Sequence, residues 1–258
     1  MNITDFKMDY FSLKGKNAIV TGGNTGLGQA FSLALAKAGA NVFMPSIMPD
    51  DAEFNRLIEN EGGKAVYMEA DITKDGIPKK IVENCVEKLG SVDILVNCAG
   101  ICVIADVLNF GRKEWDPMVS INLTAAFEMS AEVTKFMIPQ KSGKIINICS
   151  LFSFLGGQWS PAYAATKHGL AGLTKAYCDE LAQYNVQVNG IAPGYFKTKV
   201  AQASMENPER NKWIVDHTPE GRWGDVADLM GTTVFLASKA SHFVNGHILA
   251  VDGGFLTR

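Results

Sequence analysis

A serine, a tyrosine and a lysine stand at a spacing that suits proton transfer to or from an alcohol. Ser150 lies thirteen residues before Tyr163, and Lys167 lies four residues after that tyrosine. Positions i and i+4 share one face of a helix, so the phenol and the ammonium are expected side by side. A nearby cation favours the phenolate, which can take a proton from an alcohol or return it to an alkoxide. The Ser150 hydroxyl, expected at the end of a strand, can hold the reacting oxygen near the tyrosine.

A glycine-rich run far upstream gives a second chemical signal. Gly22, Gly26 and Gly28 follow a short apolar stretch and open a segment with helical periodicity. Glycines let the backbone approach a pyrophosphate closely, and a helix N-terminus offers free N–H groups and the positive end of its dipole. The spacing is Gly-x-x-x-Gly-x-Gly rather than the commoner Gly-x-Gly-x-x-Gly. This run predicts a phosphate cradle for a dinucleotide.

Each of these signals has a plain structural explanation when it stands alone. A Tyr-x-x-x-Lys pair is usually a helix face, a serine after a strand is usually a cap, and a glycine run can be a tight turn. The three occur here in one chain, each in the structural setting that its chemistry needs. Together they predict hydride transfer between a nicotinamide cofactor and an alcohol or carbonyl.

The rest of the chain alternates apolar strand-like runs with amphipathic helical stretches. This rhythm predicts the α/β class, as a single-domain doubly wound parallel seven-stranded sheet, a Rossmann fold, with helices on both faces. Residues 195–223 break the rhythm and are expected to form a substrate lid on the one domain that spans 1–258. The expected strands are 17–21, 41–44, 64–68, 93–96, 144–148, 186–191 and 247–251, and the expected helices are 26–38, 51–60, 77–89, 113–138, 161–184 and 225–237.

Composition excludes several other classes of function. The 258 residues carry a net charge of −3 without any basic run, which gives no support to nucleic-acid binding. No stretch approaches the roughly 20 apolar residues of a membrane span, and the first residues lack the apolar core of a signal peptide. The five cysteines are odd in number and, like the four histidines, lack metal-ligand spacing. We therefore expect reduced thiols, a cytoplasmic protein and no bound metal.

The motifs resemble those of the short-chain dehydrogenase/reductase family over essentially the whole chain. The resemblance rests on the glycine run, Asn97-Cys98-Ala99-Gly100, the serine, tyrosine and lysine above, and Pro193-Gly194. It implies a catalytic set of Asn122, Ser150, Tyr163 and Lys167, with Asn122 bending its helix and holding a relay water. It implies cofactor contacts at Gly22, Asn24, Thr25, Gly26, Leu27, Gly28, Ser46, Asp71, Ile72, Asn97, Ala99, Gly100, Tyr163, Lys167, Pro193, Gly194 and Thr198.

The end of the second expected strand bears on the choice between NAD and NADP. Many NAD enzymes place an acidic residue there to bind the ribose 2′-hydroxyl, whereas this chain has Ser46. Neither Asn24 nor Ile47 is a cation that would welcome a 2′-phosphate, and Asp50 and Asp51 would repel one. The sequence therefore predicts a preference for NAD(H), with NADP as the alternative cofactor.

Within the family, several segments resemble dehydrogenases of sugar acids, those acting on 2-dehydro-3-deoxy-D-gluconate, gluconate or 2-deoxygluconate. These segments are 144–148, 153–157, 221–224, 228–231 and 243–246. A sugar acid needs a cation for its carboxylate, ideally an arginine fork. The candidate substrate contacts are Phe152, Gln158, Trp159, Tyr195 and Arg222, and Lys197, Lys199 and Arg210 are further cations that could bind a polar substrate.

Two rival readings remain open on the sequence. Apolar Val103, Ile104, Phe152 and Phe154 favour a reductase of uncharged ketones or 3-oxoacyl substrates. A non-catalytic cofactor sensor could use the same fold, although the intact catalytic set argues against it. The long apolar helices 113–138 and 161–184 suggest burial against another subunit, and the family resemblance implies a homotetramer.

Overall fold

The strands form one parallel sheet, in the order β3-β2-β1-β4-β5-β6-β7. This computed structural model describes residues 5–157 and 159–258. All seven strands expected from the sequence are present, with ends that differ by a residue or two. The chain returns to the middle of the sheet after β3, so the strand order reverses between β1 and β4. Ligands of such sheets bind at the carboxyl ends of the strands near this reversal. The strands are β1 (Asn17–Val20), β2 (Asn41–Ser46), β3 (Ala65–Glu69), β4 (Ile94–Asn97), β5 (Gly143–Ile148), β6 (Val186–Pro193) and β7 (Ile248–Val251).

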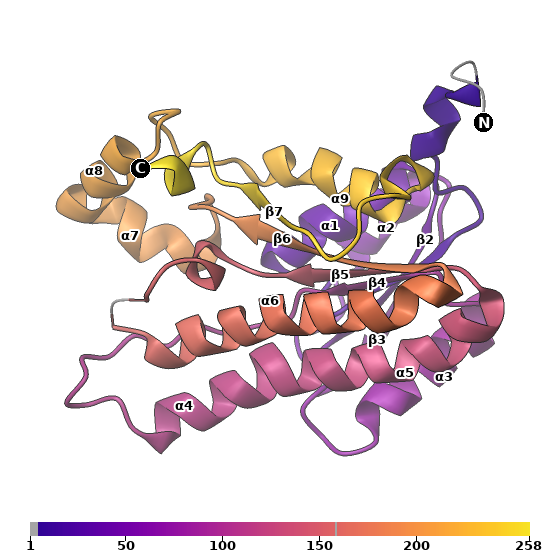
Figure 1. Ribbon diagram of the computed structural model, residues 1–258, viewed down its shortest axis with the longest axis horizontal. Coiled ribbons are helices and arrows are strands. Elements are labelled where there is room, and N and C mark those ends of the chain that lie inside the picture. The colour runs from indigo at the N-terminus through magenta and orange to yellow at the C-terminus, as the bar shows by residue number, and fades with distance from the viewer. Residues whose placement is uncertain (1–4, 158) are drawn as a thin grey trace.

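Helices cover both faces of the sheet (Figure 1). One layer holds α1 (Gly26–Lys37), α2 (Ala52–Asn60) and α9 (Met230–Ala237), and the opposite layer holds α3 (Ile77–Leu89), α4 (Arg112–Val119), α5 (Ala125–Gln140) and α6 (Pro161–Leu181). Two further helices, α7 (Gln202–Glu206) and α8 (Pro208–His217), lie beyond the carboxyl ends of the strands, at the left of Figure 1. The short 3-10 turns are η2 (Met8–Phe11), η4 (Leu151–Ser153), η5 (Ala182–Tyr184), η6 (Lys199–Ala201), η7 (Val226–Leu229), η8 (Lys239–Ser241) and η9 (Phe255–Thr257).

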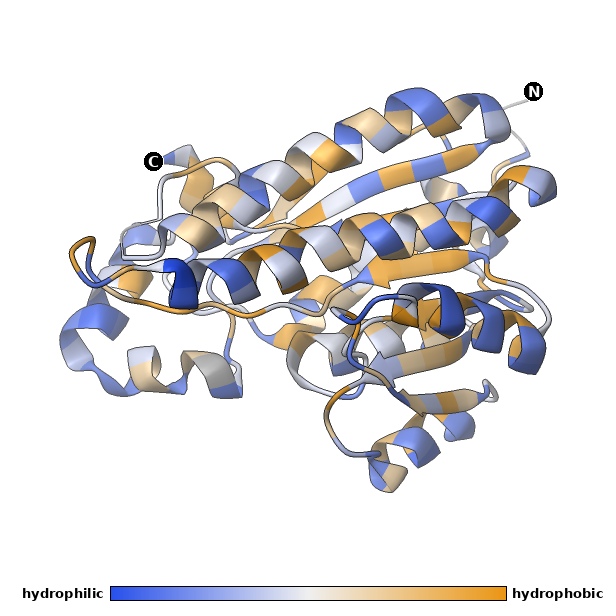
Figure 2. Ribbon diagram, turned by 90° about the horizontal axis from the view of Figure 1, so that it is seen from below, coloured by the Kyte–Doolittle hydropathy of each residue, from blue (hydrophilic) through white to orange (hydrophobic). Residues whose placement is uncertain are grey.

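The apolar strands and the inner faces of the helices make a core on each side of the sheet. The central strands are buried along their whole length and are mostly hydrophobic, as in sheets covered on both faces (Figure 2). On one side Val20 and Val96 pack with Phe31 and Leu35 of α1. The other core lies between the sheet and helices α3 and α5. No helix in the ranges described is both long and apolar enough to cross a membrane.

The expected helix 113–138 is interrupted at the residue that the family resemblance singles out. α4 and α5 are joined by a π-helical turn, η3 (Ser120–Thr124), which contains the buried Asn122. π-turns are rare and occur often at functional sites. A second difference lies in the 195–223 segment, where α7 and α8 form although this stretch has no clear periodic pattern. α8 begins after a capping residue, Asn207, whose side chain accepts a hydrogen bond from the backbone of Arg210 at 2.9 Å.

Lys144 of β5 is partly buried beside η8 and α9, which makes it a source of pH-dependent stability. Its ammonium donates to Ser241 Oγ at 3.2 Å, and burial lowers the pKa of Lys144 to about 8. Between this value and that of the unfolded lysine, the unfolded state binds more protons, so stability should rise with pH. The free energy of unfolding of the Lys144→Met variant should therefore be about 2 to 3 kcal/mol higher than that of wild type at pH 7. Urea unfolding measures this difference.

The pH dependence of that difference distinguishes burial of the charge from a packing effect. Raising the pH from 7 to about 9.5 should shrink the advantage of Lys144→Met by more than half, because wild type then loses its buried charge. Lys135, an exposed lysine that pairs with Glu132, provides the matched control in Lys135→Met. A constant advantage across this pH range would contradict the assignment.

Candidate active site

The turn between β1 and α1 is built for close approach of a ligand to its backbone. Gly22 and Gly26 adopt positive φ angles of +66° and +53°, which glycine takes without strain. A Cβ on Gly28 would lie 2.1 Å from the carbonyl oxygen of Gly22, so this turn closes on the helix only with glycine there. The exposed Thr25 leads into α1, and Leu27 packs on the core. This cradle fits the pyrophosphate of a dinucleotide.

Thr21 ties this turn to the loop that follows β4. Its hydroxyl oxygen accepts hydrogen bonds from the backbone N–H groups of Cys98 and Ala99, each at 3.0 Å. The Gly22 backbone packs close to Ala99 as well. Burial raises the pKa of the Cys98 thiol to about 12, so this thiol stays protonated in the wall of the cleft. The two loops therefore form one rigid floor.

Residues at the ends of β2 and β3 lie along the side where the adenosine half of a cofactor would fit. Ser46 is buried, and its hydroxyl oxygen accepts from the Met48 N–H at 3.1 Å. Asn24 donates to the Pro49 carbonyl at 2.8 Å, while its buried Oδ1 has no partner among the described residues. Such an orphaned acceptor fits a missing donor such as a bound ligand or water.

After β3, the chain places a carboxylate and an apolar side chain at the same edge. Hydrogen bonds from the side chain and backbone of Thr73 hold the pKa of the Asp71 carboxyl below its usual value. Ile72 is buried beside it and belongs to the core that α3 covers. Asp71 is therefore ionised at neutral pH and fixed in direction.

The loop after β4 meets the π-turn through one asparagine side chain. Asn122 Oδ1 accepts from the Ile101 N–H, and Asn122 Nδ2 donates to the Ile101 carbonyl, both at 2.8 Å. The same Nδ2 lies 3.3 Å from Thr166 Oγ1 on α6. A Cβ on Gly100 would stand 3.1 Å from Asn122 Oδ1. Asn122 thus fixes the loop, the widened turn and α6 relative to one another.

Asn97 is occupied in a buried polar network on the helical side of β4. Its Nδ2 donates to Asn147 Oδ1 at 2.8 Å and to Ser130 Oγ at 3.1 Å. Asn147 in turn donates to Thr174 on α6 at 2.9 Å. The Asn97 side chain therefore braces the sheet against the helices, and the backbone after it faces the loop that Thr21 holds.

Ser150 lies at the end of β5 and begins η4. Its hydroxyl oxygen accepts from the Phe152 N–H at 3.2 Å, which fixes the side chain yet leaves its proton to donate. The Ser150 N–H lies 3.3 Å from Ser153 Oγ, and that hydroxyl donates to the Lys167 carbonyl at 2.8 Å. Ser153 therefore links the serine to the helix that carries the tyrosine and the lysine.

Tyr163 and Lys167 lie on one face of α6, as their spacing predicts. Lys167 is buried, and its ammonium lies 5.4 Å from the centre of the Tyr163 ring. The same ammonium donates to the Ile148 carbonyl at 2.6 Å. Phe152 packs edge-on against the Tyr163 ring at 5.9 Å. The phenol is therefore held between an aromatic wall and a fixed cation.

The end of β6 leads from this cluster into the 195–223 segment. Pro193 is the last residue of β6, and the Gly194 N–H donates to the Val251 carbonyl at 2.9 Å. Thr198 caps η6, accepting from the Ala201 N–H at 3.3 Å. Tyr195 packs edge-on against Trp223 and Phe255, with ring centres 5.8 Å and 5.4 Å apart.

The structure gives the residues expected to contact the substrate different surroundings. Gln158 lies outside the described residues. Trp159 is half-exposed at φ +64°, and its carbonyl accepts from the Ala105 N–H at 2.9 Å. Arg222 pairs with Asp228 at 2.7 Å and with Glu220 at 3.0 Å, so two carboxylates already neutralise it. It lines a cavity of about 220 Å³ together with Tyr195.

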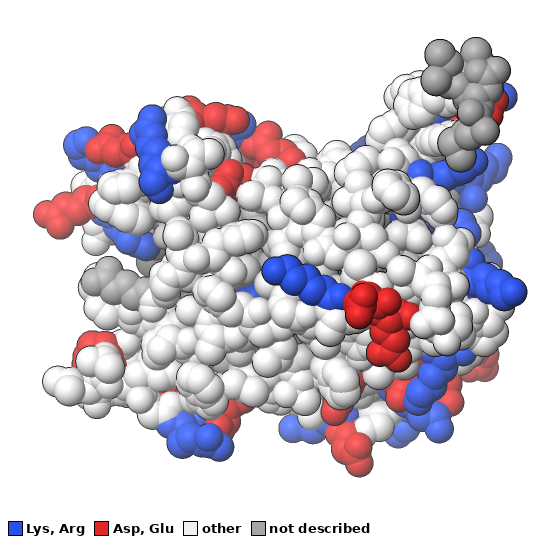
Figure 3. Space-filling model, viewed as in Figure 1, with Lys and Arg blue, Asp and Glu red and all other residues white. Residues whose placement is uncertain are grey.

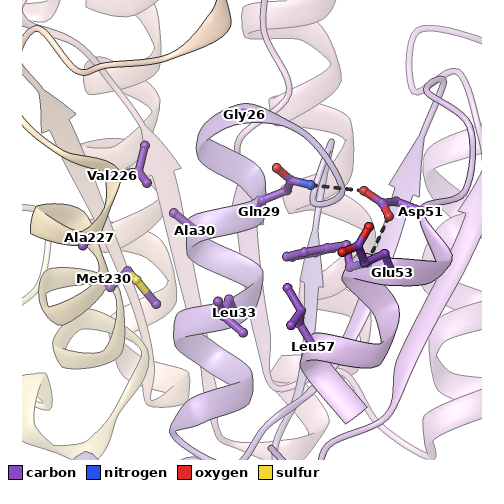
Figure 4. Close-up of a pocket in the computed structure, with 11 residues that line it drawn as sticks. Gly26, Gln29, Ala30, Leu33, Asp51, Glu53, Leu57, Val226, Ala227 and Met230 are labelled. Carbon is purple, nitrogen blue, oxygen red and sulfur yellow. Dashed lines mark hydrogen bonds between the residues drawn. The ribbon is translucent and has the colours of Figure 1, made fainter. Parts of the chain in front are cut away.

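A second groove, of about 350 Å³, shares no lining residue with that cavity (Figure 4). It runs along α1, with Leu57 of α2 on one side and Met230 of α9 on the other. Gln29 reaches Asp51 across one end of the groove at 3.5 Å. Gly26 is the point at which the groove meets the cradle.

Sequence reasoning had not assigned roles to two hydroxyls that hold the site together. Thr21 joins the two cofactor-side loops, and Ser153 joins Ser150 to α6. A serine three residues after a capping serine is a local signal that could have identified the second. For Thr21, the sequence shows only that the residue lies at the end of a strand.

Comparison with known proteins assigns the family that this fold and site define. The family model described as short chain dehydrogenase matches residues 16–209, and the chain belongs to that family. It is an NAD(P)-dependent oxidoreductase, related to dehydrogenases and reductases of gluconate and 2-dehydro-3-deoxy-D-gluconate. This membership removes the reading of the fold as a non-catalytic sensor.

Particular relatives span nearly the whole chain. The uncharacterized oxidoreductase YgcW of Escherichia coli is 64% identical, covering 100% of this chain and 98% of its own. The 2-dehydro-3-deoxy-D-gluconate 5-dehydrogenase of Bacillus subtilis is 44% identical, covering 97% and 98%. A crystal structure of a gluconate 5-dehydrogenase from Burkholderia cenocepacia, in complex with NADP and tartrate, is 37% identical with a TM-score of 0.91, covering 97% and 98%.

Proposed function

We propose that this enzyme transfers a hydride between NAD(H) and a secondary alcohol or ketone of a sugar acid, as 2-dehydro-3-deoxy-D-gluconate 5-dehydrogenases do. The observation that carries the reaction type is the fixed cluster at the ends of β5 and α6. There Ser153 links the backbone of Ser150 to the Lys167 carbonyl by hydrogen bonds, and the Lys167 ammonium lies 5.4 Å from the centre of the Tyr163 ring. Gluconate 5-dehydrogenase and 2-deoxygluconate 3-dehydrogenase activities are close variants of the same proposal.

Each side chain of the cluster has its own role in transferring a proton to or from the substrate oxygen. Tyr163 gives the proton to the oxygen of a ketone during reduction and takes it back during oxidation. Ser150 donates a hydrogen bond to that oxygen and orients it. Lys167 places its positive charge 5.4 Å from the centre of the Tyr163 ring, and Asn122 fixes the loop beside it. The nicotinamide supplies or accepts the hydride when it is bound.

The end of β2 supports NAD(H) as the preferred cofactor. Ser46 is buried, while Ile47 beside it is 71% exposed and offers no positive charge. Asp50 and Asp51 stand at the start of α2, where a 2′-phosphate would meet negative charge. The related Burkholderia structure holds NADP, so this proposal distinguishes the present chain from that relative.

A second candidate function is the reduction of uncharged ketones or 3-oxoacyl compounds. Ile104 is 69% exposed, and Val107 and Leu108 are 84% and 92% exposed in the loop that precedes α4. Side chains of this kind can cover an apolar substrate. This loop touches the loop before α6, where Ser160 Oγ donates to the Val103 carbonyl at 2.7 Å.

A substrate panel tests these two functions against each other. NADH oxidation would be followed with 5-keto-D-gluconate, neutral ketoses, simple ketones and a 3-oxoacyl thioester, and each assay repeated with NADPH. We expect turnover on the keto sugar acid and a lower KM for NADH than for NADPH. Turnover confined to uncharged carbonyls would favour the second candidate, and equal KM values would contradict the NAD(H) preference.

A single variant tests the physical reason offered for that preference. Ile47→Arg adds a cation beside the expected ribose position, so its KM for NADPH should fall about tenfold while that for NADH changes little. A lysine at position 47 would not be equivalent, because a guanidinium can bind a phosphate with two parallel hydrogen bonds and an ammonium cannot. An unchanged KM for NADPH in Ile47→Arg would mean that the ribose lies elsewhere.

We further propose a cytoplasmic homotetramer. The face over α5 and α6 is mostly free of charged side chains, with one basic and one acidic group near its middle (Figure 3). Phe127 of α5 is 50% exposed. All five cysteines are free thiols, which suits a reducing compartment. Size-exclusion chromatography with light scattering tests the oligomer, and a monomer at micromolar concentration would contradict it.

A further inference from the structure

Most cations of the 195–223 segment are already matched with carboxylates. The pairs are Lys197 with Asp225, Lys212 with Asp216, and Arg222 with Glu220 and Asp228. Arg210 of α8 and the exposed Lys199 make no ion pair with any residue that the structure describes, and of these two Arg210 lies against aromatic rings. An arginine without a carboxylate, set among aromatic rings beside a catalytic cluster, is a candidate to bind an anion.

Aromatic contacts hold the Arg210 guanidinium in place without pairing it with a carboxylate. Its central carbon lies 4.7 Å from the centre of the Trp213 ring and 5.7 Å from that of Tyr195. Nη2 donates to the Tyr195 hydroxyl at 3.3 Å. An arginine has five N–H donors in a planar fork, and stacking leaves the in-plane donors free for a carboxylate.

Tyr195 links this guanidinium to the reacting tyrosine. Burial raises the pKa of the Tyr195 hydroxyl, while Arg210 opposes this rise and both Cys102 and Tyr163 add to it. Tyr195 follows β6 at the carboxyl edge of the sheet, and β6 pairs there with the end of β5 that carries Ser150. Arg210 lies against Tyr195 and is therefore held at the same edge of the sheet as the catalytic cluster.

The helix that carries Arg210 is braced in position. Trp223 Nε1 donates to Asn211 Oδ1 at 2.7 Å, and Trp213 packs against Phe255 with ring centres 6.0 Å apart. These contacts join α8 to the C-terminal turn of the chain. A guanidinium on a braced helix needs little ordering when a ligand arrives, which favours tight binding.

We propose that Arg210 binds the carboxylate of the substrate and so makes the enzyme selective for sugar acids. This inference rests on the proposed function, because it assumes a carboxylated substrate. Four carbon–carbon bonds separate the carboxyl carbon of 5-keto-D-gluconate from its keto carbon, so the matching cation must lie across the pocket from Tyr163. Arg222 cannot take this role without giving up two carboxylates.

The test compares substrates with and without a carboxylate in two Arg210 variants. Arg210→Gln should raise KM for 5-keto-D-gluconate about 10- to 100-fold, the effect of losing a charge-assisted hydrogen bond. Its kcat/KM for a neutral ketose and its affinity for NADH should stay within about twofold of wild type. Arg210→Lys keeps the positive charge but loses the planar pair of donors. Its KM for 5-keto-D-gluconate should therefore lie between that of wild type and that of Arg210→Gln.

The matched control is Lys212→Gln, which removes an exposed positive charge from the same helix. It should leave both substrates unaffected, because surface ion pairs contribute little and its charge is screened by solvent. If Arg210→Gln loses activity equally on charged and neutral substrates, Arg210 supports the aromatic cluster and the assignment is overturned. If wild type reduces no carboxylated carbonyl, the proposed substrate class fails first, and the role of Arg210 falls with it.

Discussion

Replacing Tyr163 by phenylalanine should lower kcat by about 10²- to 10⁴-fold while the affinity for NADH stays unchanged. Positioned proton transfer contributes a factor of this size, and phenylalanine cannot supply the proton. The fold should tolerate the change, because the Tyr163 hydroxyl makes no hydrogen bond with the described residues. The ring keeps its contact with Phe152. Stopped-flow turnover and fluorescence titration of NADH measure the two quantities separately.

Tyr177→Phe is the matched control for this variant. Tyr177 lies on the same helix, and its hydroxyl lies 3.4 Å from the Phe127 carbonyl, away from the cluster. Removing that hydroxyl should leave kcat within about twofold of wild type, since this bond is long and weak. Retention of more than a tenth of wild-type kcat by Tyr163→Phe would show that another group, or water, carries the proton.

Substituting Gly28 with alanine should weaken NADH binding about 10- to 100-fold and destabilise the fold by about 1 to 3 kcal/mol. The new Cβ would stand 2.1 Å from the Gly22 carbonyl oxygen and 2.9 Å from its carbon, distances that no rotamer can relieve. The turn must open, which displaces backbone N–H groups that would face a pyrophosphate. Each lost charge-assisted hydrogen bond accounts for about one to two powers of ten in affinity.

The control uses the same substitution where there is room for it. A Cβ on Gly231, an exposed residue of α9, would meet nothing within 4 Å. Gly231→Ala should bind NADH normally and be more stable by about 0.5 to 1 kcal/mol, because alanine suits a helix better. Isothermal calorimetry and thermal unfolding report both properties. Normal NADH affinity in Gly28→Ala would mean that the pyrophosphate does not lie against this turn.

The sheet was predictable because burial on both faces leaves a strong signal in sequence. Stretches such as Ala18–Val20 and Ile94–Val96 are apolar throughout, and polar residues end them. The 195–223 segment gave no such signal, because α8 packs by a few aromatic contacts rather than along an apolar stripe. Its Trp213 is partly exposed and meets Phe255 from the far end of the chain. Contacts of this range are invisible to local patterns.

The candidate site was predictable to the extent that it depends on motifs. The pairing of Tyr163 with Lys167 follows from helical spacing, and the glycine turn follows from the demands of a phosphate. The state of each lid cation does not follow from sequence, since it depends on neighbours brought in by the fold. Arg222 and Arg210 look alike as residues, yet one is held by two carboxylates and the other by aromatic rings.

The widened turn at Ser120–Thr124 restricts how this enzyme can change in length. Residues of an α-helix advance by about 100° each, so deleting one to restore a regular helix would rotate α4 by about that angle relative to α5. Met118, now fully buried, would then swing away from the core, and Asn122 would lose the loop it holds. Single-residue insertions and deletions should therefore disrupt the fold when they fall between α4 and α5, whereas the loop before α4 should tolerate them. A new substrate range would arise in that loop, with the helix as its fixed frame.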